Sequence, residues 1–210
     1  VLMPTDTVYG LAAAATADGI RSLAAIKGRD ADKAVAVLAA TPTEALALFD
    51  RPTDALVRVA EAGWPGPLTL VAAAGADSPP AMSVNGTIGV RCPDEELVRR
   101  VTERVGPIAV TSANRAGHPP LGRLDGLDDL TGSWPEFRAV ACVVDGGALP
   151  GTASTVVDVT GDATAGPRLL RAGPIGLERV TAWWRSGVEG HTPKECAAVA
   201  GGGSSGTRGW

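Results

Sequence analysis

Short apolar runs bounded by Gly, Pro and Asp alternate along this chain with segments whose apolar residues recur at helical spacing. This alternation is typical of an α/β domain, in which helices pack on the faces of a central sheet. We expect strands over residues 34–39, 68–73, 87–92, 108–111, 140–144, 154–159 and 168–171. We expect helices over about residues 19–26, 42–48, 53–62, 94–105 and 175–184.

The two ends of the chain differ from the middle. From residue 187 the sequence becomes rich in Gly and Ser, which is typical of a flexible tail. We therefore expect one α/β domain over residues 1–186, followed by a glycine-rich tail over 187–210. At the start, only Val1, Leu2 and Met3 precede a turn-rich motif, so we expect an N-terminal element of the domain to be missing.

Charge and composition exclude several classes of protein. A formal net charge of −4 argues against a surface that grips nucleic acid through its phosphates. No apolar run approaches the roughly 20 residues that cross a bilayer, and the start has no signal-peptide pattern. Three widely spaced cysteines fit reduced thiols in a cytoplasmic protein. The two histidines have no Cys or His at ligand spacing, so we expect no structural zinc site.

Two polar segments interrupt the early, otherwise apolar sequence. Thr5, Asp6 and Thr7 follow a possible strand end, where they either face a ligand or form a turn that caps its own backbone. Lys27 and Arg29 flank a glycine, with Lys33 close behind. These bases either complement a helix dipole or form a cation cluster suited to a polyphosphate.

Further polar residues lie within or at the ends of the later expected strands. Ser112 and Asn114 follow an apolar strand, at the place where α/β sheets bind ligands, although a simple turn also fits them. Arg91 lies inside an apolar strand, where an unpaired charge would be costly. Ser154 and Arg171 mark the ends of two later strands.

Several familiar chemistries do not fit the sequence. Gly146 and Gly151 have the glycine spacing of a phosphate-binding P-loop, but Thr152 and Ala153 follow where that motif needs Lys and Ser or Thr. Neither histidine is placed as the base of a nucleophilic serine, and no pair of carboxylates suits acid/base work. The remaining cations and hydroxyls can bind and neutralise anions.

Eight motifs occur in an order that resembles the YrdC-like family. The resemblance covers residues 4 to about 180 and rests on Pro-Thr-Asp-Thr-Val-Tyr-Gly-Leu, Lys-x-Arg, Trp-Pro-Gly-Pro-Leu-Thr, Val-Arg-Cys-Pro, Ser-x-Asn, Gly-x-Pro, Ser-Thr-Val-Val-Asp and Leu-Arg-x-Gly. It implies a twisted, open, mixed α/β sheet with helices around a deep basic groove. It also implies a nucleotidyltransferase, an L-threonylcarbamoyladenylate synthase. Such an enzyme makes threonylcarbamoyl-AMP from L-threonine, bicarbonate and ATP, with release of pyrophosphate, for threonylcarbamoyladenosine modification of tRNA.

The same resemblance implies roles for individual residues. Catalysis would rest on Lys27, Arg29, Ser112 and Asn114; ATP would bind to Arg29, Lys33, Thr87, Ser112 and Arg171; and threonine would bind to Thr7, Arg91, Thr111 and Ser154. Mg²⁺ would accompany ATP, and a downstream tRNA threonylcarbamoyl transferase would take the product. Two alternatives stay open: a non-catalytic module that binds double-stranded RNA or tRNA, and a carbamoyl-adenylate-forming domain of a maturation or antibiotic pathway.

Overall fold

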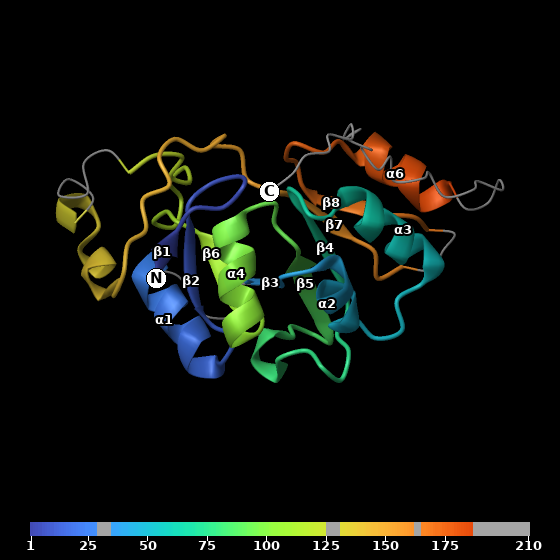
Figure 1. The fold of residues 1–210 in the computed structure, drawn as a ribbon, viewed down its shortest axis with the longest axis horizontal. Coiled ribbons are helices and arrows are strands. Elements are labelled where there is room, and N and C mark those ends of the chain that lie inside the picture. The colour runs from blue at the N-terminus through green and yellow to red at the C-terminus, as the bar shows by residue number, and fades with distance from the viewer. Residues whose placement is uncertain (29–34, 125–130, 162–164, 187–210) are drawn as a thin grey trace, which may run out of the picture.

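A computed structural model describes residues 1–28, 35–124, 131–161 and 165–186. Its centre is an eight-stranded sheet in the order β1-β2-β6-β3-β5-β4-β7-β8 (Figure 1). The β3–β5 and β4–β7 pairs are parallel and the others are antiparallel, so the predicted open, mixed α/β sheet is confirmed. The strands are β1 Leu2–Met3, β2 Gly10–Ala14, β3 Ala36–Leu38, β4 Leu68–Ala73, β5 Thr87–Arg91, β6 Ile108–Ser112, β7 Thr155–Asp158 and β8 Arg168–Arg171.

Three helices begin directly after a capping threonine. Thr16, Thr41 and Thr53 each accept a backbone N–H bond in the first turn of the helix that follows, which satisfies a donor that the helix itself cannot. The helices are α1 Ala17–Lys27, α2 Pro42–Ala47, α3 Asp54–Gly63, α4 Glu96–Val105 and α6 Leu177–Arg185, with short 3₁₀ turns η1 Pro80–Met82 and η2 Pro135–Ala139. Among the described residues, no helix has the length and apolar character needed to cross a bilayer.

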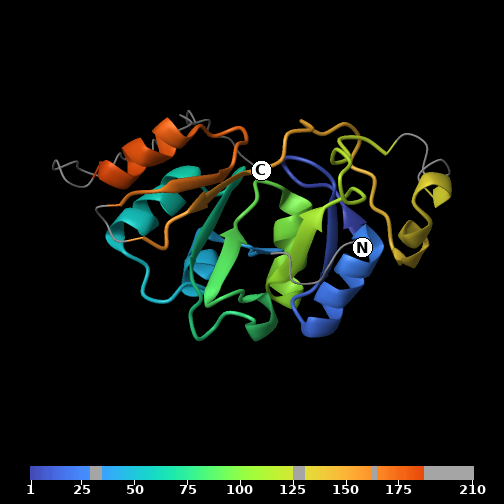
Figure 2. The same cartoon turned by 180° about the vertical axis from the view of Figure 1, so that it is seen from behind.

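The two faces of the sheet are covered differently. Helices α1, α2, α3 and α6 contribute residues to the larger apolar cluster, together with Leu11, Val37, Leu70 and Val90 of the strands. Helix α4 instead packs its buried Val98 against strand residues of the opposite face at β2, β3 and β6. Figures 1 and 2 show α3 and α6 side by side at the β7–β8 end of the sheet, with α1 at the β1–β2 end. Beyond α4, the second face carries the pocket described below.

One expected strand is absent from the structure, and one observed strand was not expected. Residues 140–144 do not form a strand; Leu2 bonds Cys142 O at 2.8 Å and accepts from Val144 N at 2.9 Å, which makes one isolated bridge. Strand β1 has only two residues, so it is too short to pair with residues 140–144 along their whole length. Conversely, β2 was not expected, because alanine-rich segments have low strand propensity. Its pairing along the whole length of β6 overrides that preference.

Candidate active site

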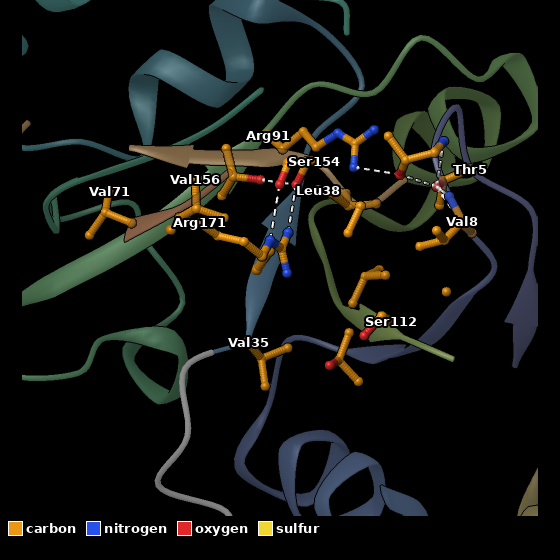
Figure 3. A pocket seen from close by; sticks show the side chains of 18 of the residues that line it. Thr5, Val8, Val35, Leu38, Val71, Arg91, Ser112, Ser154, Val156 and Arg171 are labelled. Atoms are coloured by element: carbon orange, nitrogen blue, oxygen red, sulfur yellow. Dashed lines mark hydrogen bonds between the residues drawn. The ribbon is translucent and has the colours of Figure 1, made fainter. Parts of the chain in front are cut away.

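A pocket of about 390 Å³ lies over the second face of the sheet (Figure 3). Its floor comes from strand residues that share this face, since register places Gly89 of β5 opposite both Ala36 of β3 and Val71 of β4. Adjacent strands therefore bring chemistry from distant parts of the sequence to one site.

Every site residue that was predicted from the sequence and lies in the described ranges lines this pocket. These residues are Thr7, Lys27, Thr87, Arg91, Thr111, Ser112, Asn114, Ser154 and Arg171. Arg29 and Lys33 lie outside the described residues, and so does the expected tail over 187–210. The pocket thus brings together residues from all three polar regions of the sequence: the Thr5–Thr7 segment, the end of α1 and the strand ends.

Lys27, Ser112 and Asn114 form one end of the site, here called the Lys27 cluster. Lys27 is the last residue of α1, which Gly28 ends in the left-handed conformation, with φ of 61°. Its buried ammonium donates to the backbone oxygen of Ser112 and, at 2.8 Å, to Asn114 Oδ1. Ser112 Oγ also donates to Asn114 Oδ1, at 2.7 Å. Hydrogen bonds thus join the C-terminal end of α1 to the end of β6.

Arg91 is held at the end of β5 by three different groups. Its Nε donates to Gly66 O at 3.0 Å and its Nη1 to Thr7 Oγ1 at 3.1 Å, while Nη2 pairs with Asp6 Oδ1. The side chain is 7 % exposed. Burial lowers the pKa of Arg91 below its usual value, nearby Arg171 lowers it further, and Asp6 opposes both effects. The charge that seemed costly in an apolar strand therefore has a buried partner.

Arg171 lies at the end of β8 and contacts Ser154 twice. Its Nε donates to Ser154 O at 3.0 Å and its Nη2 to Ser154 Oγ at 2.9 Å (Figure 3). Ser154 Oγ is also 2.9 Å from Thr69 Oγ1 of β4. We call Arg91, Arg171 and Ser154 the arginine cluster. Within the described part of the chain, no salt bridge joins Arg171 to a carboxylate.

The pocket is positively charged. Lys27, Arg91 and Arg171 all line it, and no Asp or Glu occurs among its described lining residues. Asp6 neutralises Arg91 from outside the lining, whereas Arg171 keeps its full charge. Burial lowers the pKa of Arg171, but its ordinary value is so high that the guanidinium stays charged. The site can therefore bind several anionic groups at once, and its described lining supplies no carboxylate or imidazole base.

The remaining predicted residues border the pocket between and beside these clusters. Thr87 begins β5, the strand that ends at Arg91, and its hydroxyl donates to Val84 O at 2.9 Å. Thr111 precedes Ser112 on β6. Thr7 Oγ1 lies 3.0 Å from Thr5 Oγ1, and Thr5 Oγ1 in turn donates to Val8 O at 2.6 Å. Both readings of the Thr5–Thr7 segment therefore hold, because it caps its own turn and also lines the pocket.

Sequence reasoning gave no individual role to three residues that shape the site. Thr5 and Thr69 line the pocket, and Asp6 holds Arg91. The charge of Arg91 inside an apolar strand was a usable signal for Asp6, because a buried cation needs an acidic partner. Thr69 had no such signal, since a threonine in a strand is ordinary.

Comparisons with known proteins agree with this geometry. Residues 1–173 match the Sua5/YciO/YrdC family model, which is described as "Telomere recombination". A putative threonylcarbamoyl-AMP synthase of Mycobacterium tuberculosis is 36 % identical over 187 residues, which cover 86 % of this chain and 81 % of that protein. A threonylcarbamoyl-AMP synthase of Bacillus subtilis is 33 % identical over 188 residues, which cover 87 % of this chain and 52 % of that protein.

Solved structures show the same architecture. The chain is similar to Pyrococcus abyssi Sua5 complexed with L-threonine, with a TM-score of 0.74 and 31 % identity over 86 % of this chain and 52 % of that one. Escherichia coli YciO gives a TM-score of 0.72 over 85 % of each chain. At 19 % identity, this second likeness concerns the fold alone.

Proposed function

The chain belongs to the Sua5/YciO/YrdC family, and we propose that it is a threonylcarbamoyl-AMP synthase, a nucleotidyltransferase that acts in threonylcarbamoyladenosine modification of tRNA. The observation that carries this proposal is the convergence of Lys27, Arg91 and Arg171 on one pocket whose described lining has no acidic residue. Such a pocket suits substrates that bring a carboxylate, bicarbonate and a triphosphate together.

The reaction joins three substrates without needing a strong protein base. The amine of L-threonine combines with bicarbonate to give a carbamate and water. A carbamate oxygen then attacks the α-phosphorus of ATP, the bond from that phosphorus to the bridging oxygen breaks, and pyrophosphate leaves. Catalysis by positioning and charge stabilisation is sufficient for such a phosphorus-centred displacement.

Each substrate is assigned its own set of pocket residues. The Lys27 cluster supports the phosphates of ATP, with Arg171 and Thr87 as further contacts. Arg91 and Ser154 receive threonine, together with Thr7 and Thr111. A pocket that meets the carboxylate and hydroxyl of threonine with polar partners would discriminate against amino acids that lack the hydroxyl. Arg29 and Lys33 would add charge on the ATP side.

Mg²⁺ finds no carboxylate ligand in the described lining, which offers hydroxyl, amide and backbone oxygens beside three cations. Protein-held Mg²⁺ ordinarily uses one or two carboxylates together with substrate phosphates. This part of the pocket therefore does not form a metal site of its own, and no step of the proposed reaction depends on a protein-held metal.

The product defines the next step. Threonylcarbamoyl-AMP is a mixed anhydride, an activated acyl group that a transferase can pass to the adenosine of a tRNA. We therefore propose a downstream tRNA threonylcarbamoyl transferase as the functional partner. The comparisons give no support to the alternative of a double-stranded-RNA-binding module, since the matched relatives carry the name of the synthase.

The decisive experiment measures pyrophosphate release from ATP. Purified protein should release pyrophosphate only when both L-threonine and bicarbonate are present. Lys27→Ala should lower this rate by about 10²-fold or more, because it removes a buried cation and its hydrogen bonds from the end of α1 to Ser112 and Asn114. Arg21→Ala is the matched control on the same helix, because Arg21 is exposed and pairs with Asp18 on the surface.

Three outcomes would contradict the proposal. Pyrophosphate release that is indifferent to threonine would exclude the synthase. Release that needs carbamoyl phosphate in place of threonine and bicarbonate would favour the carbamoyl-adenylate alternative. An unchanged rate in Lys27→Ala would show that the Lys27 cluster does not serve ATP.

A further inference from the structure

The glycine-rich loop over residues 145–152 has P-loop glycine spacing but a different use. It leads directly into Ala153 and Ser154, which line the pocket. A phosphate loop points free backbone N–H groups at its ligand. Here, four loop N–H groups are already engaged within the protein: Gly146 N on Tyr9 Oη, Gly147 N on Asp145 Oδ1, Leu149 N on Gly122 O and Gly151 N on Thr7 O.

The glycines serve close approach and turn geometry. A Cβ at Gly146 would lie 2.6 Å from the Cβ of Pro4, so the loop packs directly on the start of the Thr5–Thr7 segment. Gly147 and Gly151 have φ of 74° and 80°, a conformation that glycine adopts without strain. The loop is therefore bound to the segment that carries Thr7.

Tyr9 joins these parts. Its side chain is fully buried, and its hydroxyl lies 2.9 Å from each of Asp145 Oδ1, Gly147 O and Gly146 N. Its backbone oxygen accepts from Ala113 N at 2.7 Å, between Ser112 and Asn114. Tyr9, which follows Thr7 by two positions, thus contacts both the end of β6 and the loop before Ser154. Burial raises the pKa of Tyr9, so the hydroxyl keeps its proton.

We infer that Tyr9 is a positioning residue for the threonine end of the pocket: its hydroxyl anchors the 145–152 loop to the Thr5–Thr7 segment, so that Thr7 and Ser154 face the same ligand. This inference rests on the proposed function for its substrate. Removing the hydroxyl leaves the backbone bond to Ala113, and hence the Lys27 cluster, intact. The variant should therefore bind threonine more weakly, while its binding of ATP stays unchanged.

The test is Tyr9→Phe, which keeps the buried ring. We expect the KM for threonine to rise about tenfold while kcat and the KM for ATP stay within about twofold of wild type. Amide hydrogen exchange of Gly146 should become about tenfold faster, because the hydroxyl that accepts its N–H bond is gone. This second readout does not depend on activity.

Three further variants act as controls. Asp145→Asn keeps an oxygen that can accept from Tyr9 Oη and Gly147 N, so it should resemble wild type, whereas Asp145→Ala should resemble Tyr9→Phe. Thr160→Val removes another hydroxyl that donates to a carboxylate, Asp158, away from the pocket lining, and should leave both KM values unchanged.

Two results would overturn the inference. One is a Tyr9→Phe protein with a lower melting temperature but an unaltered threonine KM, since that marks a purely structural hydroxyl. The other is unaltered amide exchange at Gly146, whose N–H donates to the Tyr9 hydroxyl. If wild-type protein shows no threonine-dependent pyrophosphate release, the proposed function fails. The exchange comparison then still decides whether Tyr9 anchors the loop.

Discussion

The two faces of the central sheet are built from the same strands but carry opposite chemistry. On β4, Leu70 points into the larger apolar cluster under the helices, whereas neighbouring Thr69 lines the pocket. On β5, Val90 and Arg91 divide in the same way. Because side chains alternate along a strand, one buried strand can serve stability with one residue and binding with the next.

The comparison also shows how cations can lie on a buried sheet. The apolar face gains stability by removing hydrocarbon from water. The pocket face carries charged groups, and each has polar partners: Lys27 on β6, Arg91 on Asp6, and Arg171 on Ser154. Burying such groups without partners would cost several kcal/mol. We therefore expect changes on the first face to alter stability, and changes on the second to alter activity.

The largest stability effect should come from Leu70→Ala. Leu70 is fully buried beneath the helices, and truncation of such a leucine costs about 2–5 kcal/mol through lost burial and a residual cavity. Urea unfolding should show this loss, while the folded fraction keeps its pyrophosphate-release rate. A selective loss of activity with unchanged stability would contradict the division between the two faces.

Arg171→Ala should have the largest effect on the pocket face. Arg171 has no carboxylate partner within the described chain, so its removal lowers the positive charge available to the substrates. We expect kcat/KM to fall about 10²-fold, with little change in unfolding free energy. Arg168→Ala on the same strand is the control, because Arg168 is exposed and pairs with Asp158. An equal loss in both variants would argue against a specific role for Arg171.

Thr69→Val should have a smaller effect. The change keeps the shape of the side chain but removes a hydroxyl 2.9 Å from Ser154 Oγ, which retains its bond from Arg171. We expect the KM for threonine to rise about fivefold, equivalent to about 1 kcal/mol for one hydrogen bond. Steady-state kinetics with threonine as the varied substrate measures this. A change in the KM for ATP alone would contradict the assignment of Ser154 to threonine.

The smallest effect concerns acid stability. Burial raises the pKa of Asp158, but hydrogen bonds from Thr160 and Arg168 outweigh it and hold the pKa below its usual value. A depressed folded pKa means that this carboxylate stabilises the fold above its unfolded pKa of about 3.9 and loses that contribution as the pH falls through the folded value. Melting temperature measured from pH 6 downward should therefore fall less steeply in Asp158→Asn than in wild type. If the melting temperatures of both proteins fall equally with pH, Asp158 contributes nothing to acid stability.

The sequence predicted most of the regular elements for local reasons. Apolar residues at helical spacing marked the helices, and apolar runs marked β4, β5 and β6. It did not predict β2, because a run of alanines has no strand signal of its own and depends on β6 for pairing. Residues 140–144 had the apolar pattern of a strand but met only Leu2 of a two-residue neighbour.

The sequence by itself determined the kind of chemistry this protein can perform, because motif order and residue type name the cations and hydroxyls of the pocket. Only the tertiary structure decided how they work together. It gave Arg91 a buried partner in Asp6, left Arg171 without one in the described chain, and turned a glycine loop with phosphate-loop spacing into an anchor on Tyr9. The physical reason is that residue type acts locally. Charge pairing and hydrogen bonding depend instead on distances between segments that only strand pairing brings together.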